Sequence, residues 1–279
     1  MNTPVISITA PQAASKKHAV RYALARSLLL LASAVTGTAA LAQGAPRDFL
    51  GVGAISLPEF QGSADRGVAP FVVGRFDFGD AGSLRLNGVS AQYNLLSAKS
   101  AWAAGPLVAL RPARDDGVTD EVVKKLRKVD ATAELGAFVQ RGWENVAGRG
   151  DSLALGVEAR GGKGTQVSLT SLYRAPRSGA LQLGADARVD FADDKHMQTY
   201  FSVDADNSTR SGLPVYAAGS GAKSASLGFT GMYDLNRDWM LIGRLGYSRL
   251  LGDAKDSPIV QRRGEAGAVS LGLAVGYRF

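Results

Sequence analysis

The carboxy-terminal stretch Gly267–Phe279 reads GAVSLGLAVGYRF, and its side chains alternate between two faces. Every second residue from Val269 to Phe279 is large and apolar, whereas the residues between them are small or polar. A period of two over this length is typical of a β-strand and not of a helix. Strands of soluble proteins usually run about 5–6 residues, but a strand that crosses a bilayer needs about 9–11. The stretch therefore predicts a membrane-spanning strand that ends at Phe279.

The same alternation recurs along the chain, for example in Leu181–Phe191 and Ala225–Leu235. A soluble sandwich alternates in the same way, but aromatic residues near many strand ends indicate the girdles of an outer-membrane barrel. We expect an all-β fold, a transmembrane antiparallel up-and-down β-barrel with apolar side chains toward lipid and polar side chains toward the lumen. About twelve strands are predicted, with ten as the alternative because the first is irregular and the ninth is short. They are Phe49–Leu57, Val68–Phe78, Leu84–Asn94, Ala101–Arg111, Asp130–Gln140, Ser152–Arg160, Gln166–Arg174, Ala180–Phe191, Met197–Val203, Ala222–Leu235, Trp239–Leu250 and Gly267–Phe279.

The first 42 residues have the pattern of a secretory signal peptide. A basic region without acidic residues precedes the apolar run Leu28–Val35, which is too short to span a bilayer as a helix. Ala40 and Ala42 then give the A-x-A cleavage signal, with the cut before Gln43. The basic region contains Lys16, Lys17, Arg21 and Arg26.

We therefore divide the chain into a signal peptide, residues 1–42, and one outer-membrane barrel, residues 43–279. Removal of the signal peptide takes away four basic residues and no acidic ones, which lowers the net charge from +7 to +3. The remaining charge does not indicate a nucleic-acid partner. The chain has no cysteine, which excludes disulfide bonds, a thiolate metal site and a lipoprotein anchor. No cofactor is expected.

An even number of strands places both termini in the periplasm. By this count, the long connections Asp204–Gly221 and Leu251–Ala266 follow odd-numbered strands and face outward. Pro112–Val129 follows the fourth predicted strand, so it is expected in the periplasm although it is long and highly charged. The short connections expected in the periplasm are Gly79–Ser83, Gly161–Thr165, Ala192–His196 and Asn236–Asp238.

Within the charged connection, Asp120–Lys128 reads DEVVKKLRK. Acidic residues at its start and basic residues toward its end suit a short amphipathic helix, although a solvated charged linker fits the sequence equally well. The helical interpretation gives a docking surface for a periplasmic partner or for anionic lipid head groups. Its candidate contact residues are Glu121, Lys124, Lys125, Arg127 and Lys128.

Seven charged residues fall on the lumen face of the predicted strands. An ion-pair network that fills a narrow barrel is the favoured interpretation, and a selectivity lining for a small pore is the alternative. About twelve strands leave an interior that is either plugged or open. The lumen-lining candidates are Glu134, Glu158, Arg160, Asp186, Arg188, Asp190 and Arg244.

The sequence offers little to an enzyme. His196 is the single histidine after residue 42, and it stands beside Asp193 and Asp194. A solvated turn is favoured over a zinc site there, because no second histidine or cysteine is present to complete the ligand set. No serine lies in the G-x-S-x-G context of a nucleophile elbow. We expect no catalytic activity.

Several motifs recur in a characteristic order. Pro58–Ser63 reads PEFQGS, Ser211–Tyr216 reads SGLPVY and Tyr247–Ala254 reads YSRLLGDA. Asp256–Val260 then reads DSPIV, and the chain ends in Tyr277–Phe279, YRF. In this order and spacing the motifs resemble the MipA/OmpV family, the MltA-interacting outer-membrane proteins, over nearly all of the chain after residue 42.

The resemblance implies a Gram-negative cell outer membrane barrel and a non-enzymatic scaffold. Such a scaffold brings a lytic transglycosylase together with a bifunctional penicillin-binding protein in peptidoglycan biosynthesis. Other members are associated with adhesion or small-molecule uptake, so a small channel or an adhesin is the alternative. Further expected partners are outer-membrane lipid, lipopolysaccharide and the barrel-assembly machinery. The residues of the carboxy-terminal signal that this machinery reads are Leu271, Leu273, Val275, Tyr277 and Phe279.

Overall fold

The computed structural model describes residues 48–97 and 99–279. The predicted signal peptide and its cleavage site, Ala40, Ala42 and Gln43, lie outside the described residues. None of the helices in the described part of the chain is long and apolar enough to span a bilayer.

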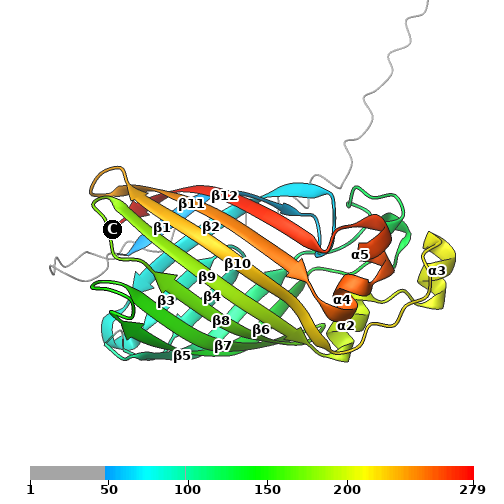
Figure 1. The fold of residues 1–279 in the computed structure, drawn as a ribbon, viewed down its shortest axis with the longest axis horizontal. Coiled ribbons are helices and arrows are strands. Elements are labelled where there is room, and N and C mark those ends of the chain that lie inside the picture. The colour runs from blue at the N-terminus through cyan, green and yellow to red at the C-terminus, as the bar shows by residue number, and fades with distance from the viewer. Residues whose placement is uncertain (1–47, 98) are drawn as a thin grey trace, which may run out of the picture. The chain divides into compact units, whose positions relative to one another are not determined.

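The described residues form a closed barrel of twelve strands, in which each strand pairs antiparallel with its neighbours in the chain (Figure 1). The barrel closes where β1 pairs with β12, from Phe49 opposite Arg278 to Ser56 opposite Leu271. The predicted fold class is therefore confirmed. The strands are β1 (Phe49–Pro58), β2 (Arg66–Asp77), β3 (Ser83–Asn87), β4 (Ser90–Asn94), β5 (Trp102–Arg111), β6 (Thr132–Glu144), β7 (Ser152–Gly162), β8 (Gly164–Arg174), β9 (Leu181–Ala192), β10 (Gly221–Asp234), β11 (Trp239–Leu250) and β12 (Gly267–Arg278).

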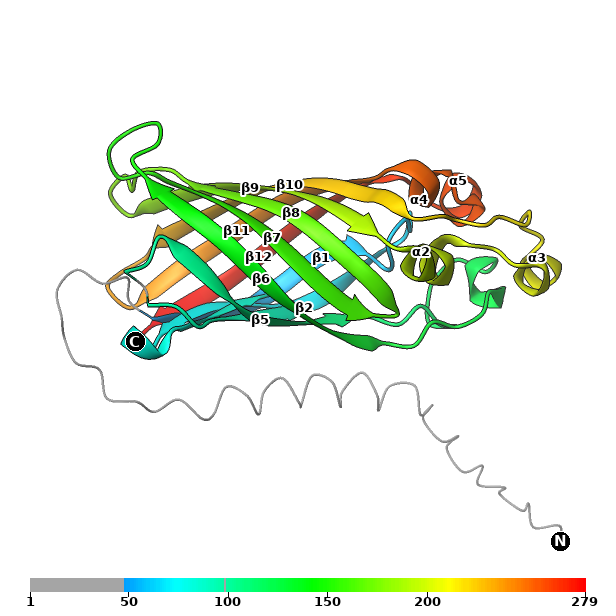
Figure 2. The same cartoon turned by 90° about the horizontal axis from the view of Figure 1, so that it is seen from below.

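The two ends of the barrel differ in their connections (Figure 2). We call the end that holds Asp48 and Phe279 the terminus end; there the backbone N–H of Phe279 donates to the carbonyl of Asp48 at 3.0 Å. The connections at the terminus end are short. The opposite, helical end carries the longer connections 112–131, 193–220 and 251–266. They contain η3 (Val123–Lys125), α2 (Asp194–Phe201), α3 (Ala205–Ser211), α4 (Gly252–Asp256) and α5 (Pro258–Arg263), while η2 (Gly79–Ala81) lies in a terminus-end turn.

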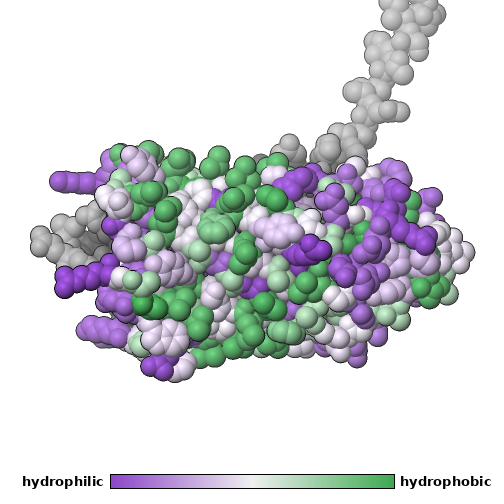
Figure 3. Space-filling view, viewed as in Figure 1, coloured by the Kyte–Doolittle hydropathy of each residue, from purple (hydrophilic) through white to green (hydrophobic). Residues whose placement is uncertain are grey.

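The outer wall of the barrel is apolar. Large apolar side chains on neighbouring strands point outward, and Leu135, Phe229 and Leu273 are 68%, 58% and 58% exposed. Figure 3 shows this apolar surface over the barrel wall toward the terminus end and a polar surface over the helical end. An exposed apolar area of this extent is the expected surface of a lipid-facing barrel.

The predicted strand Leu84–Asn94 is wrong as a single strand, because it is the hairpin β3–β4. Asn87 and Ser90 face each other and close a two-residue turn. Gly88 is the first residue of this turn, with φ of +60°, a conformation that a type II′ turn requires and that glycine adopts without strain. The two strands have five residues each, so β3 pairs only with the half of β2 from Val73 to Asp77.

The predicted strand Met197–Val203 is also wrong, because most of it is the helix α2. The Asp193 carboxylate accepts the backbone N–H of His196 at 2.8 Å and caps this helix. Met197 and Phe201, four residues apart, both point into the core and are each 1% exposed. The cap at Asp193 and the helical spacing of Met197 and Phe201 therefore outweigh the weak strand-like alternation of this segment.

One error removes a strand and the other adds one, so the predicted total of twelve is unchanged. Every connection between the two segments is nevertheless assigned to the wrong end of the barrel. Pro112–Val129, Gly161–Thr165 and Ala192–His196 lie at the helical end, opposite Phe279, and not at the terminus end where we expected them. The expected placement of Pro112–Val129 at the same end as the chain termini is therefore wrong. The periplasmic side of the termini stays a prediction.

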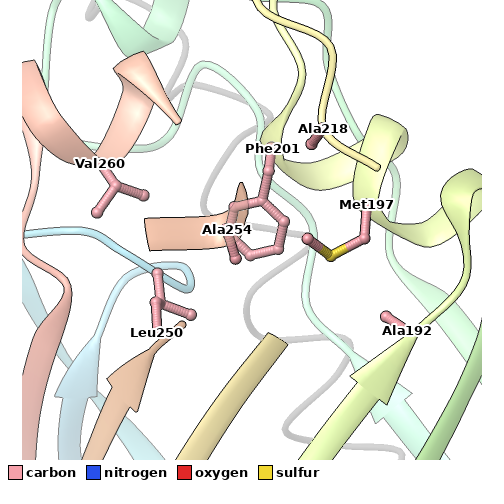
Figure 4. Close-up of a cluster of buried hydrophobic side chains, with 7 residues drawn as sticks. All are labelled: Ala192, Met197, Phe201, Ala218, Leu250, Ala254 and Val260. Carbon is pink, nitrogen blue, oxygen red and sulfur yellow. The ribbon is translucent and has the colours of Figure 1, made fainter. Parts of the chain in front are cut away.

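The helices at the helical end have a hydrophobic core of their own. Figure 4 shows Met197 and Phe201 of α2 pointing toward Ala254 of α4 and Val260 of α5, above Leu250 at the end of β11. A second cluster joins the connection 112–131 to α5 and to the segment after α3: Val118, Val123, Leu126, Val203, Leu213 and Ile259. These two clusters bind the long connections to one another and to the rim of the barrel.

Candidate functional site in the barrel lumen

A buried polar network fills the lumen beneath α2, and we call it the polar plug. One part is centred on Glu134 of β6, which is 4% exposed. Arg111 Nε donates to Glu134 Oε1 at 2.6 Å, and Arg160 Nε lies 3.3 Å from Glu134 Oε2. One carboxylate between two guanidinium groups leaves this part of the polar plug positively charged.

The other part of the polar plug is centred on Asp190 of β9. Its carboxylate accepts hydrogen bonds from Ser168 at 2.6 Å, Ser224 at 2.9 Å and Arg188 at 2.8 Å. Lys223, which is fully buried, donates to Gln166 Oε1 at 2.6 Å, and its Nζ lies 4.0 Å from Asp190 Oδ2. A buried ammonium group needs a nearby counter-charge, and Asp190 supplies it.

The helix α2 covers the polar plug. Tyr200 packs against Arg111, whose guanidinium carbon lies 5.0 Å from the ring centre. His196 is 1% exposed, and its ring lies 4.7 Å from that of Tyr200. Burial, together with the positive charges of Lys223 and Arg111, lowers the pKa of His196 to about 3. The imidazole is therefore neutral over the physiological range, and its Nε2 has no hydrogen-bond partner among the described residues.

Below the polar plug, a cavity of about 590 Å³ extends toward the terminus end. Arg177 and Arg278 line it near the terminus end, and Glu158 and Arg188 line it on the side of the polar plug. Asp186 of β9 and Arg244 of β11 line the same space and meet over β10 in a two-pronged ion pair, with N–O distances of 2.8 and 3.0 Å. We call this cavity the vestibule; its lining runs from residues beside the polar plug to residues near the terminus end.

The seven lumen-lining candidates all point inward, but they occupy different levels. Glu134, Arg160 and Asp190 belong to the polar plug, and Asp186 and Arg244 line the vestibule. Glu158 and Arg188, paired at 2.8 Å, lie where the two meet. The arrangement is an ion-pair network, and a role of these residues in selectivity stays a prediction.

Sequence reasoning missed six basic residues on the strands that face the lumen: Arg75, Arg85, Arg111, Arg174, Lys223 and Arg278. Arg85 was hidden because its strand was merged with the next one. Arg174 and Lys223 stand at the ends of their strands, where alternation is weakest as a guide. The signal for Arg85 was present in Leu84-Arg85-Leu86, a charged residue between two apolar neighbours.

The docking candidates on the connection 112–131 are mostly occupied by partners within the chain. Lys124 pairs with Glu121, and Lys128 Nζ lies 3.1 Å from Asp116. Arg127 pairs with Asp204 at 3.0 Å, and its backbone N–H donates to Asn207 at 2.7 Å. The segment forms a short 3₁₀ turn rather than an α-helix, with Val123 buried beneath it. The segment therefore belongs to the packed structure of the helical end and offers little free surface.

The carboxy-terminal signal candidates form one outward row on β12. Leu271, Leu273 and Val275 are exposed on the lipid-facing side. The Tyr277 ring lies 5.1 Å from that of Trp239 and 5.4 Å from that of Phe279. This aromatic group sits at the terminus end, and its recognition by the assembly machinery stays a prediction.

No group of three or more histidine, aspartate or glutamate side chains in the described residues is placed to hold a metal ion. The closed barrel, its apolar belt and its polar interior define the class of the protein, an integral outer-membrane β-barrel.

The family model of MltA-interacting protein MipA matches residues 50–279. The chain therefore belongs to the MipA family, and its location is the Gram-negative outer membrane. No curated protein matches the chain.

Solved structures with related folds share little sequence with the chain. The NanC porin is 10% identical, with 84% of this chain and 100% of that chain covered and a TM-score of 0.43. The translocator domain of the autotransporter NalP from Neisseria meningitidis is 14% identical, with coverage of 95% and 98% and a TM-score of 0.41. OmpT of Vibrio cholerae is 7% identical, with coverage of 85% and 99% and a TM-score of 0.36.

Proposed function

We propose that this protein is a non-enzymatic scaffold of the outer membrane that holds a lytic transglycosylase, and through it a penicillin-binding protein, at the periplasmic face. The observation that carries the proposal is the family match, whose description names an interaction with MltA and which spans the whole barrel. The polar plug supports a binding role over free conduction, because side chains of six strands fill the lumen below α2.

The docking surface of this scaffold is the terminus end. In outer-membrane barrels the short turns face the periplasm and the longer loops face outward. In this chain the long connections 112–131, 193–220 and 251–266 all lie at the helical end, whereas the connections beside Phe279 are all short. The helical end, with residues 112–131, then faces the cell exterior. A periplasmic enzyme therefore contacts the terminus-end turns, where Arg149 and Arg237 are exposed cations with no ion pair among the described residues.

Cysteine labelling tests the orientation directly, because the chain has no cysteine of its own. Thr209→Cys in α3 and Arg237→Cys in the turn 235–238 each place one thiol on an exposed position. A membrane-impermeant maleimide added to intact cells should label the Thr209 variant and leave the Arg237 variant unlabelled until the outer membrane is permeabilised. The reverse pattern would place the helical end in the periplasm and overturn the assigned docking surface.

Capture of an MltA-type lytic transglycosylase by the purified barrel tests the docking itself. The double variant Arg149→Glu/Arg237→Glu should capture less enzyme than the unaltered protein. Lys125→Glu is the matched control, since Lys125 is an exposed cation at the opposite end and has no ion pair with any described residue. Loss of capture in the Lys125 variant alone would mean that the enzyme docks on the connection 112–131 and not on the terminus end. If neither form of the barrel captured the enzyme, the scaffold role would be wrong.

A small solute channel is the second candidate, and the vestibule of about 590 Å³ is the observation in its favour. Conduction requires the polar plug to move, because Lys223, Gln166 and Asp190 are buried between the vestibule and α2. Recording in planar bilayers separates the two roles. Steady conductance of the unaltered protein would favour the channel, and neutralising Asp186 would then change its ion selectivity.

A further inference from the structure

Three arginine side chains face the vestibule, and two of them, Arg85 and Arg174, have no ion pair among the described residues. Arg75 of β2 and Arg85 of β3 stand directly opposite each other, and both line the cavity. Arg174 of β8 lines the same space. Like charges directly opposite on neighbouring strands destabilise a sheet, so a pair of arginines at this register costs stability that the chain does not recover within the barrel.

The other lumenal cations have partners. Arg111 and Arg160 share Glu134, Arg188 pairs with Glu158 and Asp190, and Arg244 pairs with Asp186. In contrast, Arg85 and Arg174 have no ion pair and no side-chain hydrogen bond among the described residues. Arg75 has one long contact, 3.6 Å from its Nη2 to Asp77.

The two carboxylates that line the vestibule, Glu158 and Asp186, are already taken. Glu158 accepts from Gln92 at 2.7 Å and pairs with Arg188, and Asp186 holds Arg244 with both oxygens. Glu158 and Glu144 act on Arg85 and Arg174 only at longer range than an ion pair, so the vestibule keeps a net positive charge. In a narrow space with partly apolar walls, such a charge concentrates anions from solution.

From this geometry we infer that the vestibule is a binding site for a small organic anion with two or more carboxylate or phosphate groups, held by Arg75, Arg85 and Arg174. Planar guanidinium groups match the oxygen pairs of carboxylates and phosphates and bind them with two hydrogen bonds. A volume of about 590 Å³ is in the range of small-molecule sites.

The wall of the vestibule combines apolar and polar surface. Phe71 of β2, Met240 and Ile242 of β11 and Ala274 of β12 pack into an apolar cluster, so part of the wall beside Arg75 is apolar. Asn87, Gln92 and Gln140 line the space and add neutral hydrogen-bonding groups. The ligand enters from the terminus end and stops at the polar plug, so the site binds and retains a solute without passing it on. This inference does not depend on the scaffold role.

The test is a calorimetric titration of the barrel in lipid nanodiscs with citrate and with inorganic phosphate. Citrate should bind saturably at one site, more tightly than phosphate because it engages several arginines, and both should weaken as salt is raised. Arg85→Gln and Arg174→Gln should each weaken citrate binding about tenfold or more, as expected for a lost charged hydrogen bond. Arg237→Gln, on the outer surface of the same end, is the matched control and should bind like the unaltered protein.

Thermal unfolding without ligand gives an independent measurement. Arg85→Gln should raise the melting temperature, because it removes the repulsion with Arg75, whereas a purely structural arginine would lower it when replaced. Citrate should raise the melting temperature of the unaltered protein and not that of Arg85→Gln/Arg174→Gln. Arg85→Lys, which keeps the charge but loses the two-pronged geometry, serves if the glutamine variant does not fold.

Two results would overturn the inference. One is the absence of saturable citrate binding to the unaltered barrel at low salt. The other is equal citrate affinity of the unaltered protein and the double arginine variant. Equal affinity for phosphate and citrate would show that the site does not require a ligand with several acid groups. The vestibule would then bind anions without selectivity, and the inference would be wrong on this point.

Discussion

Replacing Asp190 by asparagine should destabilise the barrel more than any other neutralisation of a lumenal carboxylate. Asp190 accepts hydrogen bonds from Ser168, Ser224, Gln166 and Arg188 and is the counter-charge nearest to Lys223. Lys223 is fully buried, so it cannot turn to water when the carboxylate is lost. Removing one partner of a buried ion pair costs about 3–5 kcal/mol, and we expect a loss in this range.

The control is Asp186→Asn, which breaks the ion pair with Arg244 in the open vestibule. These two side chains are 28% and 24% exposed, so water screens the remaining arginine and the loss should be about 1 kcal/mol. Urea unfolding in phospholipid vesicles, followed by the fluorescence of Trp102, Trp143 and Trp239, gives the free energy of unfolding of each variant.

A second substitution separates the charge effect from the lost hydrogen bonds. In the Asp190→Asn background, Lys223→Met removes the stranded ammonium group and should recover about 1 kcal/mol or more, the coupling expected between contacting groups. A loss for Asp190→Asn no larger than that for Asp186→Asn would refute the reasoning. So would simple additivity of the Asp190 and Lys223 substitutions.

Three further predictions concern assembly, pH and the barrel seam. Deletion of Phe279 should reduce insertion into the outer membrane, measured by heat-modifiable migration of the folded barrel, and normal insertion would exclude a signal role. The folded-state pKa of His196 lies below its unfolded value, so the unfolded chain binds the extra proton and stability should fall as the pH drops below about 6.5. Between pH 7 and 4.5 the loss should be about 2–3 kcal/mol in hydrogen exchange of α2, and His196→Gln should abolish it. Gly53→Ala places a Cβ 1.9 Å from the carbonyl oxygen of Leu273 in the pairing strand and should cost about 1–3 kcal/mol or more, whereas Gly67→Ala, with no atom within 4 Å, should be nearly neutral in urea unfolding.

Much of the barrel follows from side-chain alternation alone. A lipid-facing wall requires an apolar residue at every second position, and the long strands β9 to β12 carry this pattern with little interruption. Asn87-Gly88 is a strong signal for a hairpin, but the alternation of Leu84 and Leu86 continues past it in Ala91 and Tyr93. Because the alternation continues through a tight turn, it does not show where one strand ends and the next begins.

The helix α2 shows the opposite difficulty. Met197, Thr199 and Phe201 alternate as in a strand, and the decisive difference is the capping of the helix by Asp193. The orientation of the connection 112–131 followed from the count of strands before it, so one merged hairpin reversed its side. Because the side of each connection is assigned by counting strands, one such error reverses every later connection until a second error cancels it, here at α2.

The lumen was predictable in outline and not in its functional detail. Alternation identified Asp186, Arg188 and Asp190 because each stands between apolar neighbours in a long strand. It could not reveal which charges neutralise one another, because ion pairs such as Glu158 with Arg188 join strands that are not neighbours. The uncompensated arginines become visible only when the pairing of the whole lumen is known.

The short hairpin β3–β4 has a consequence for the way the protein sits in its membrane. The carbonyl of Val72 accepts the N–H of Gly88 at 2.7 Å, so alternate positions before it, Arg66, Val68 and Pro70, direct their backbone groups to the same side. No strand pairs with them on that side in the described residues, and Pro70 has no N–H to leave free. Hydrocarbon tails offer no hydrogen bond to an open strand edge. The tip of the hairpin therefore marks the limit of the hydrocarbon region on this side of the barrel: the lipid tails end near Gly88, and the part of β2 from Arg66 to Pro70 lies beyond them.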